Sequence, residues 1–165
     1  ITIIDSPMSG ATIAANEARL TFMVGCEKVF FNYIEPLLGL MGTRVNHIGN
    51  YGSGMMVKVL NNFIAASSVV SVRHVLHQAQ KFDLDIDSLF KTIDTSSGQT
   101  WFGTNRADIE WFKENFENDN TMGILKKDVE AYVDSFENES DLDNFVSGEL
   151  STAIIKAINN MPVTK

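Results

Sequence analysis

The spacing of apolar residues divides the chain into a β-rich beginning and a helical remainder. Three short runs, Ile1–Ile4, Leu20–Val24 and Arg44–Ile48, predict strands, because each carries residues that favour strands and turn residues follow it. Residues 27–40 place apolar side chains at helical spacing, which predicts a helix between the second and third strands. Residues 11–18 fit either a turn or a short helix.

A long helix is predicted over residues 55–81, which contain neither glycine nor proline. At 1.5 Å per residue it would extend about 40 Å. Apolar residues lie on almost every side of it, which is typical of a buried helix, so we expect it to be the central helix of the core. The polar residues within it indicate a core helix rather than a membrane span.

Further helices are predicted over residues 87–94, 121–136 and 143–160, the first of them capped by Asp87 or Asp85. Residues 101–116 are aromatic and irregular. The expected fold class is therefore mainly α, with a small α/β segment at residues 1–50, a glycine-rich hinge, and a helical domain at residues 51–165.

Composition excludes several classes of partner. The net charge of -8 argues against binding nucleic acid or an anionic membrane surface, both of which require clustered Lys and Arg. Cys26 is the single cysteine, so no internal disulfide can form. His74 and His77 share a helix face but lack nearby Cys or carboxylate ligands, so we expect no metal site. The opening ITIIDSP resembles a strand already under way, so we expect the chain to be part of a longer protein.

Lys58 is the most informative single residue, because no other formal charge lies between Arg44 and Arg73. Burial disfavours the charged form of a lysine and lowers its pKa toward the range that a general acid or base requires. Asn62 is four residues later and projects from the same helix face, where an amide can orient a substrate oxygen. The alternative is that Lys58 extends from a half-exposed first turn into solvent. The spacing alone leaves both open.

The glycines before this helix do not form a dinucleotide fingerprint. GNYGSG, residues 49–54, has the order G-x-x-G-x-G rather than G-x-G-x-x-G. It is consistent with a flexible connector that lets backbone approach a ligand.

Several motifs, in order along the chain, resemble the β-hydroxyacid dehydrogenase family, which includes 3-hydroxyisobutyrate dehydrogenase and tartronate semialdehyde reductase. The motifs are DSPMSGA (5–11), LTFMVG (20–25), HIGNYGSGMMVKVLNN (47–62), SSGQTWFGTNR (96–106) and ILKKDVEAYVDS (124–135). The resemblance implies a 6-phosphogluconate dehydrogenase C-terminal-like helical domain with a long central helix, preceded by the last strands of a Rossmann domain.

The resemblance also implies roles for individual residues. Lys58 would be the acid/base of hydride transfer and Asn62 would orient the reacting oxygen. Ser9 and Gly10 would hold the substrate carboxylate. Lys127 would reach the cofactor or substrate, with the neighbouring Asp128 as its structural partner; the alternative for Lys127 is an ordinary surface lysine.

By the same resemblance the complete protein would be a cytoplasmic enzyme that uses NAD or NADP and acts on a small 3-hydroxy acid or semialdehyde. The helical domain would form a homodimer. The Gly-rich pyrophosphate turn of the Rossmann domain is not in this sequence, so we expect the chain alone to be inactive.

The chain departs from the family pattern at four glycine positions, which carry Ala11, Ala14, Ala18 and Cys26. Asn61 occupies a position where the related 6-phosphogluconate dehydrogenases usually carry histidine, which argues against a decarboxylating activity. These departures motivate an alternative, in which the chain is a non-catalytic helical dimerisation module of a degenerate homologue.

Overall fold

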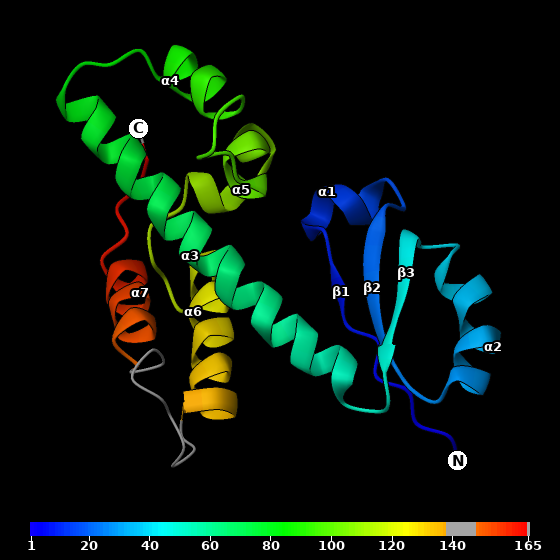
Figure 1. Ribbon diagram of the computed structural model, residues 1–165. Coiled ribbons are helices and arrows are strands. Elements are labelled where there is room, and N and C mark those ends of the chain that lie inside the picture. Colours follow the sequence, from blue (N-terminus) through cyan, green and yellow to red (C-terminus); the bar gives the residue numbers. More distant parts are fainter. Residues whose placement is uncertain (138–147, 165) are drawn as a thin grey trace. The chain divides into compact units, whose positions relative to one another are not determined.

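The computed structural model describes residues 1–137 and 148–164 (Figure 1). The chain divides into two compact units, Ile1–Asn61 and Asn62–Lys165. Each unit is described separately below. The sequence analysis placed the boundary between residues 50 and 51, whereas the two units meet between Asn61 and Asn62. The difference arises because the first turns of the long helix belong to the first unit.

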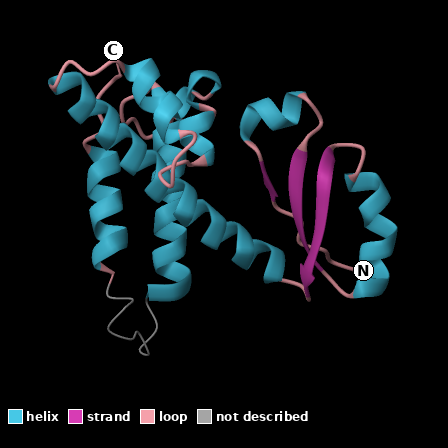
Figure 2. Ribbon diagram, turned by 45° about the horizontal axis from the view of Figure 1, so that its top comes forward, coloured by secondary structure: helices cyan, strands magenta, loops and turns pink. Residues whose placement is uncertain are grey.

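The first unit is built on a three-stranded sheet in the order β1-β2-β3, formed by β1 (Met8–Ser9), β2 (Leu20–Gly25) and β3 (Gly42–Gly49). Strand β1 is antiparallel to β2, and β2 is parallel to β3 (Figure 2). The parallel pair is joined by α2 (Lys28–Leu38), since parallel strands require a crossover connection. The short helix α1 (Ala11–Asn16) connects β1 to β2.

The core of the first unit lies between the sheet and its helices. It contains the buried residues Ala14, Leu20, Phe22, Val24, Cys26, Phe31 and Leu38. The β2 run is apolar and mostly buried, as expected for a strand with neighbours on both sides. The predicted strands at Leu20–Val24 and Arg44–Ile48 and the predicted helix over residues 27–40 are confirmed.

The predicted strand at Ile1–Ile4 is wrong. These residues have no ladder pairing in the structure, and Ile1 and Ile3 are exposed. Pairing begins only at Asp5, which forms an isolated bridge with Gly25. A β-branched sequence favours extended backbone, but a strand also needs a neighbour with free hydrogen-bonding groups.

The long helix α3 (Ser53–Lys81) begins in the first unit and continues into the second. The second unit adds α4 (Ile86–Ile93), α5 (Trp101–Thr104), the 3₁₀ turns η1 (Arg106–Asp108) and η2 (Glu110–Phe112), α6 (Thr121–Tyr132), the π-helical turn η3 (Val133–Glu137) and α7 (Glu149–Asn159). The mainly α fold class is confirmed. Of the helix predicted over residues 143–160, residues 143–147 lie outside the described part of the chain.

An aspartate and an asparagine side chain cap the starts of α4 and α6 in this unit. Asp85, rather than Asp87, caps α4 by accepting a hydrogen bond from the backbone N–H of Ser88 at 2.8 Å. Asn120 caps α6 by accepting from the backbone N–H groups of Met122 and Gly123. Both caps satisfy amides that have no partner within their own helix.

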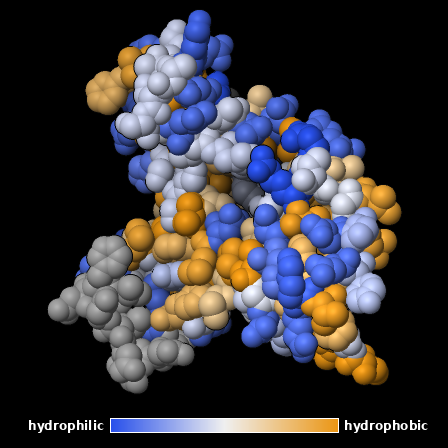
Figure 3. Space-filling model, turned by 45° about the vertical axis from the view of Figure 1, so that its right-hand side comes forward, coloured by the Kyte–Doolittle hydropathy of each residue, from blue (hydrophilic) through white to orange (hydrophobic). Residues whose placement is uncertain are grey.

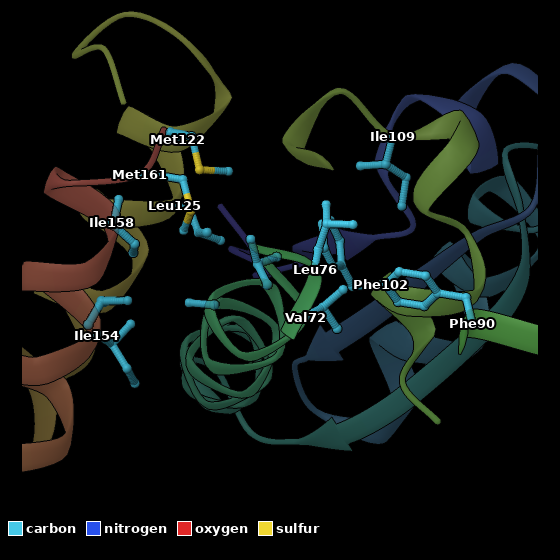
Figure 4. Close-up of a cluster of buried hydrophobic side chains, with 13 residues drawn as sticks. Val72, Leu76, Phe90, Phe102, Ile109, Met122, Leu125, Ile154, Ile158 and Met161 are labelled. Carbon is cyan, nitrogen blue, oxygen red and sulfur yellow. The ribbon is translucent and has the colours of Figure 1, made fainter. Parts of the chain in front are cut away.

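The core of the second unit forms along one stripe of α3. Its buried positions include Ala66, Val69, Val72, Leu76 and Ala79, spaced three or four residues apart. Figure 4 shows Val72 and Leu76 between side chains of α6 and α7 on one side and of Phe102 and Ile109 on the other.

The expectation that α3 is a buried helix is met along one stripe of it only. Met56, Leu60 and Ile64 are 54%, 41% and 70% exposed, and apolar side chains also reach the molecular surface elsewhere (Figure 3). By length and composition α3 also qualifies as a possible membrane span, so its polar residues do not exclude that role as the sequence suggested. Core helices of soluble proteins pass the same test, and the stripe of α3 described above is packed in a protein core.

Candidate active site

The N-terminal part of α3 carries Lys58, the residue on which the predicted chemistry depends. The chain turns at Gly52, which has a φ of 94°, and the backbone N–H of Ser53 donates to the carbonyl oxygen of Asn50 at 3.1 Å. The helix begins at Ser53, which places Lys58 in its second turn. Lys58 is half-buried, which is intermediate between the buried lysine and the half-exposed lysine that the sequence analysis left open.

Asn62 follows Lys58 by one helical turn on α3. The i, i+4 spacing places the two side chains on the same face of the helix. Asn62 is also half-buried. This face presents an ammonium and an amide close together, which is a suitable pair for exchanging a proton with a substrate oxygen and orienting that oxygen.

Ser9 and Gly10 occupy the end of β1 and the start of α1. Ser9 pairs with Thr21 of β2, and Gly10 precedes α1 with a φ of 132°. A Cβ at Gly10 would lie 2.4 Å from the Cβ of Ala14, so only glycine fits there. Both residues are half-buried. Their predicted convergence with Lys58 on one substrate remains a prediction.

Lys127 lies on α6, in the second unit, where its side chain is exposed. Its neighbour Lys126 has a different environment, because its ammonium lies 3.5 Å from the carboxylate of Glu130 and over the ring of Phe116. Asp128 is half-buried beside them. Lys127 is therefore accessible to a ligand from solvent, whereas Lys126 is engaged by its own helix and by the aromatic segment.

The replaced glycine positions differ in how the fold accommodates them. Ala11 and Ala18 have φ values of 55° and 51°, in the left-handed region that glycine adopts without strain. Ala14 is buried against Gly10, and Cys26 is buried in the core of the first unit. Burial raises the pKa of the Cys26 thiol, and the charges of Asp5 and Glu27 act in the same direction, so this thiol is not activated.

Asp5 is a residue of this region whose importance the sequence analysis missed. Its carboxylate accepts hydrogen bonds from the backbone N–H groups of Gly52 and Met55. In the sequence analysis Asp5 appeared only as the first residue of the DSPMSGA motif and received no role. No local pattern signals a bond to residues about fifty positions away.

The comparisons with known proteins cover both parts of the chain. Residues 52–145 match the family described as "NAD-binding of NADP-dependent 3-hydroxyisobutyrate dehydrogenase". Residues 1–49 match the family described as "NAD binding domain of 6-phosphogluconate dehydrogenase". Both descriptions name a nicotinamide cofactor, as the sequence analysis expected. The chain belongs to the β-hydroxyacid dehydrogenase family.

Individual relatives agree with this assignment. The chain is 36% identical over 98 residues to the mitochondrial 3-hydroxyisobutyrate dehydrogenase of Drosophila melanogaster, which covers 59% of this chain and 30% of the relative. It is 33% identical over 101 residues to the 2-(hydroxymethyl)glutarate dehydrogenase of Eubacterium barkeri, which covers 61% of this chain and 34% of the relative. The chain thus spans about a third of the length of these relatives.

A solved structure shows the same fold. The 3-hydroxyisobutyrate dehydrogenase of Salmonella typhimurium aligns with a TM-score of 0.76 at 18% identity, over 95% of this chain and 53% of that one.

Proposed function

We propose that this chain is the C-terminal part of an NAD(P)-dependent oxidoreductase that interconverts a small 3-hydroxy acid and its semialdehyde, with Lys58 as the general acid/base. The observation that carries the proposal is the Lys58–Asn62 pair on one face of α3, directly after a glycine turn, in a member of this family. The names of the relatives support a hydroxy acid with a carboxylate as the substrate class.

In this proposal Lys58 accepts the hydroxyl proton as the alcohol is oxidised, and returns a proton to the oxygen as the aldehyde is reduced. Asn62 donates a hydrogen bond from its amide to the same oxygen, which fixes its direction relative to the ammonium. A bound nicotinamide supplies the hydride acceptor or donor. General acid/base catalysis of this kind contributes about 10²- to 10⁴-fold to a rate.

The substrate carboxylate would be held by the first unit. The hydroxyl of Ser9 and the backbone N–H of Gly10 are the proposed donors, at the point where β1 ends. Lys127 is the proposed contact to the cofactor, because its exposed ammonium suits a phosphate or carboxylate oxygen. Residues for the remainder of a nicotinamide site would come from outside this chain.

The test is an NAD(P)H-linked assay of the complete protein with a panel of small 3-hydroxy acids and semialdehydes. We expect Lys58→Met to lower kcat by about 100-fold or more while cofactor binding is retained. Lys28→Met is the control, because Lys28 lies over the ring of Phe31 on α2 and has no proposed role. Turnover by Lys58→Met within twofold of the parent would refute the role of Lys58.

A second candidate function is a non-catalytic homodimerisation module. The exposed apolar residues Met56, Leu60 and Ile64 favour it, because they recur every four residues along α3 and form one apolar stripe. If dimerisation is the sole function, the complete protein has no NAD(P)H-linked activity, and Ile64→Glu converts a dimer to a monomer in sedimentation experiments. An active enzyme can also use this stripe to dimerise, so the assay distinguishes the two candidates.

A further inference from the structure

The carboxylate of Asp5 caps the long helix from a distant part of the first unit. Its Oδ1 accepts a hydrogen bond from the backbone N–H of Gly52 at 2.8 Å, and its Oδ2 accepts one from the backbone N–H of Met55 at 2.8 Å. These amides lie at the start of α3, where no intrahelical acceptor is available. The negative charge also lies at the positive end of the helix dipole. We call these two hydrogen bonds the Asp5 cap.

The position of Asp5 is itself fixed by the sheet. Its backbone N–H donates to the carbonyl oxygen of Gly25 at 3.2 Å, and the N–H of Gly25 donates to the carbonyl oxygen of Asp5 at 2.9 Å. Two reciprocal bonds therefore attach this residue to the end of β2. The backbone that carries the carboxylate cannot move independently of the strand.

Two glycines leave space for the carboxylate. A Cβ at Gly25 would lie 2.1 Å from Oδ1 of Asp5, and a Cβ at Gly54 would lie 2.6 Å from Oδ2. The same Cβ at Gly54 would lie 2.3 Å from the carbonyl oxygen of Met23. The first turn of α3 thus approaches the end of β2 more closely than any residue with a side chain would permit, and Asp5 fills the space between them.

The Asp5 cap connects the two segments that carry the proposed active-site residues of the first unit. Asp5 precedes Ser9 by four residues, and Lys58 follows Gly54 by four residues, one helical turn further along α3. Any rotation or displacement of the first turn of α3 relative to Asp5 would displace Lys58 with it.

We propose that Asp5 is a positioning residue for catalysis, which sets the place of Lys58 by capping α3. This inference rests on the proposed function, because it acts through Lys58. A displacement of about 1 Å at a reacting group lowers a rate by as much as 100-fold, so we expect loss of the cap to lower kcat by about 10- to 100-fold with little change in the KM for substrate.

The experiment compares Asp5→Ala, Asp5→Asn, Lys58→Met and the double variant Asp5→Ala/Lys58→Met in the complete protein. Asp5→Asn keeps one acceptor oxygen and the shape of the side chain, so it provides a milder variant if Asp5→Ala does not fold. The matched control is Asp85→Ala, which removes a similar carboxylate cap from α4. It should lower stability without a selective effect on kcat.

A positioning role predicts that the double variant is no slower than Lys58→Met alone, because Asp5 acts only through the lysine. A purely structural role predicts losses that multiply, and that outcome would overturn the proposal. So would a kcat for Asp5→Ala within twofold of the parent. Hydrogen exchange of the Gly52 and Met55 amides should accelerate in Asp5→Ala, and unchanged exchange would show that the cap is not formed.

The two proposals fail in different ways. If Lys58→Met retains full turnover, the proposed function fails and the positioning role fails with it. If Lys58→Met loses turnover but Asp5→Ala does not, the proposed function stands and the positioning role alone is overturned.

Discussion

The guanidinium of Arg73 donates a hydrogen bond to the backbone carbonyl oxygen of Trp111 at 2.6 Å. The same nitrogen donates to the carbonyl oxygen of Glu114 at 3.0 Å, and the other terminal nitrogen donates to that of Pro162. Arg73 is only 4% exposed, and burial lowers its pKa. One side chain of α3 thus joins the aromatic segment to the end of the chain within the second unit.

We expect Arg73→Met to lower the free energy of unfolding by about 2 to 4 kcal/mol, because the three backbone carbonyl groups lose the hydrogen bonds that the buried guanidinium donates to them. Urea denaturation of the chain measures this. The control Arg19→Met removes an exposed ion pair with Glu17 and should change stability by less than about 1 kcal/mol. Equal effects of the two variants would contradict a structural role for Arg73.

Restoring glycine at two of the replaced positions, Ala11 and Ala18, should stabilise the protein. Ala11→Gly and Ala18→Gly remove the strain energy of a left-handed alanine, and this gain exceeds the cost of the greater conformational entropy of the unfolded chain. We therefore expect each variant to raise the free energy of unfolding by about 0.5 to 1 kcal/mol. The midpoint of chemical denaturation reports the gain. Ala15→Gly, within α1, should lower stability instead, because its backbone is helical.

The close approach of α3 to β2 makes Gly54 intolerant of a side chain. Gly54→Ala should lower the free energy of unfolding by about 2 kcal/mol, since the new methyl group would meet both the Met23 carbonyl and Asp5. Gly98→Ala is the control, because the nearest atom to its Cβ would be the Ile93 methyl at 3.7 Å. Thermal unfolding of both variants would show whether the steric limit is confined to Gly54.

Lys127 and Lys126 form a neighbouring pair with different expected roles. Lys127→Met should raise the KM for cofactor or substrate of the complete protein several-fold, because an exposed cation is lost from the proposed binding surface. Lys126→Met should leave both KM values unchanged and affect only its own contacts with Glu130 and Phe116. Steady-state kinetics with each lysine variant separates the two roles.

Asp85 should give the helical unit a dependence on acidic pH. Hydrogen bonds from Ser88 lower the pKa of the Asp85 carboxyl in the folded chain below that of an unfolded aspartate, near ~3.9. Its contribution is therefore fully present above pH ~4 and is lost as the pH falls through the folded pKa. Asp85→Asn should reduce the pH dependence of stability between pH 4 and pH 2, as followed by circular dichroism. If the loss of stability between pH 4 and pH 2 is the same in Asp85→Asn as in the parent, other carboxylates are responsible for it.

Local patterns were sufficient to predict most helices of this fold. The helices over residues 27–40, 55–81 and 121–136 follow from apolar spacing within the segment itself. The sequence also identified Lys58 and Asn62 as neighbours on one face, because an i, i+4 relationship is local. Family resemblance added the expected roles, which geometry alone did not provide.

Features that depend on distant neighbours were not predictable in this way. The exposed side of α3 depends on which elements pack against it, so an apolar composition suggested more burial than the structure shows. The strand expected at Ile1–Ile4 required a pairing partner that no local pattern reveals. The Asp5 cap joins residues 47 and 50 positions apart, and nothing in either segment indicates the other.

That separation has a consequence for how the first unit folds. The contact between Asp5 and Gly52 closes a loop of nearly fifty residues, which lowers the entropy of the chain. We expect the strand pairing and the burial in the β2–α2–β3 crossover to offset this loss. We therefore expect the first turn of α3 to acquire its native contacts with Asp5 after this crossover has formed. On this view β3 must align beside β2 before the Asp5 cap can form at the start of α3.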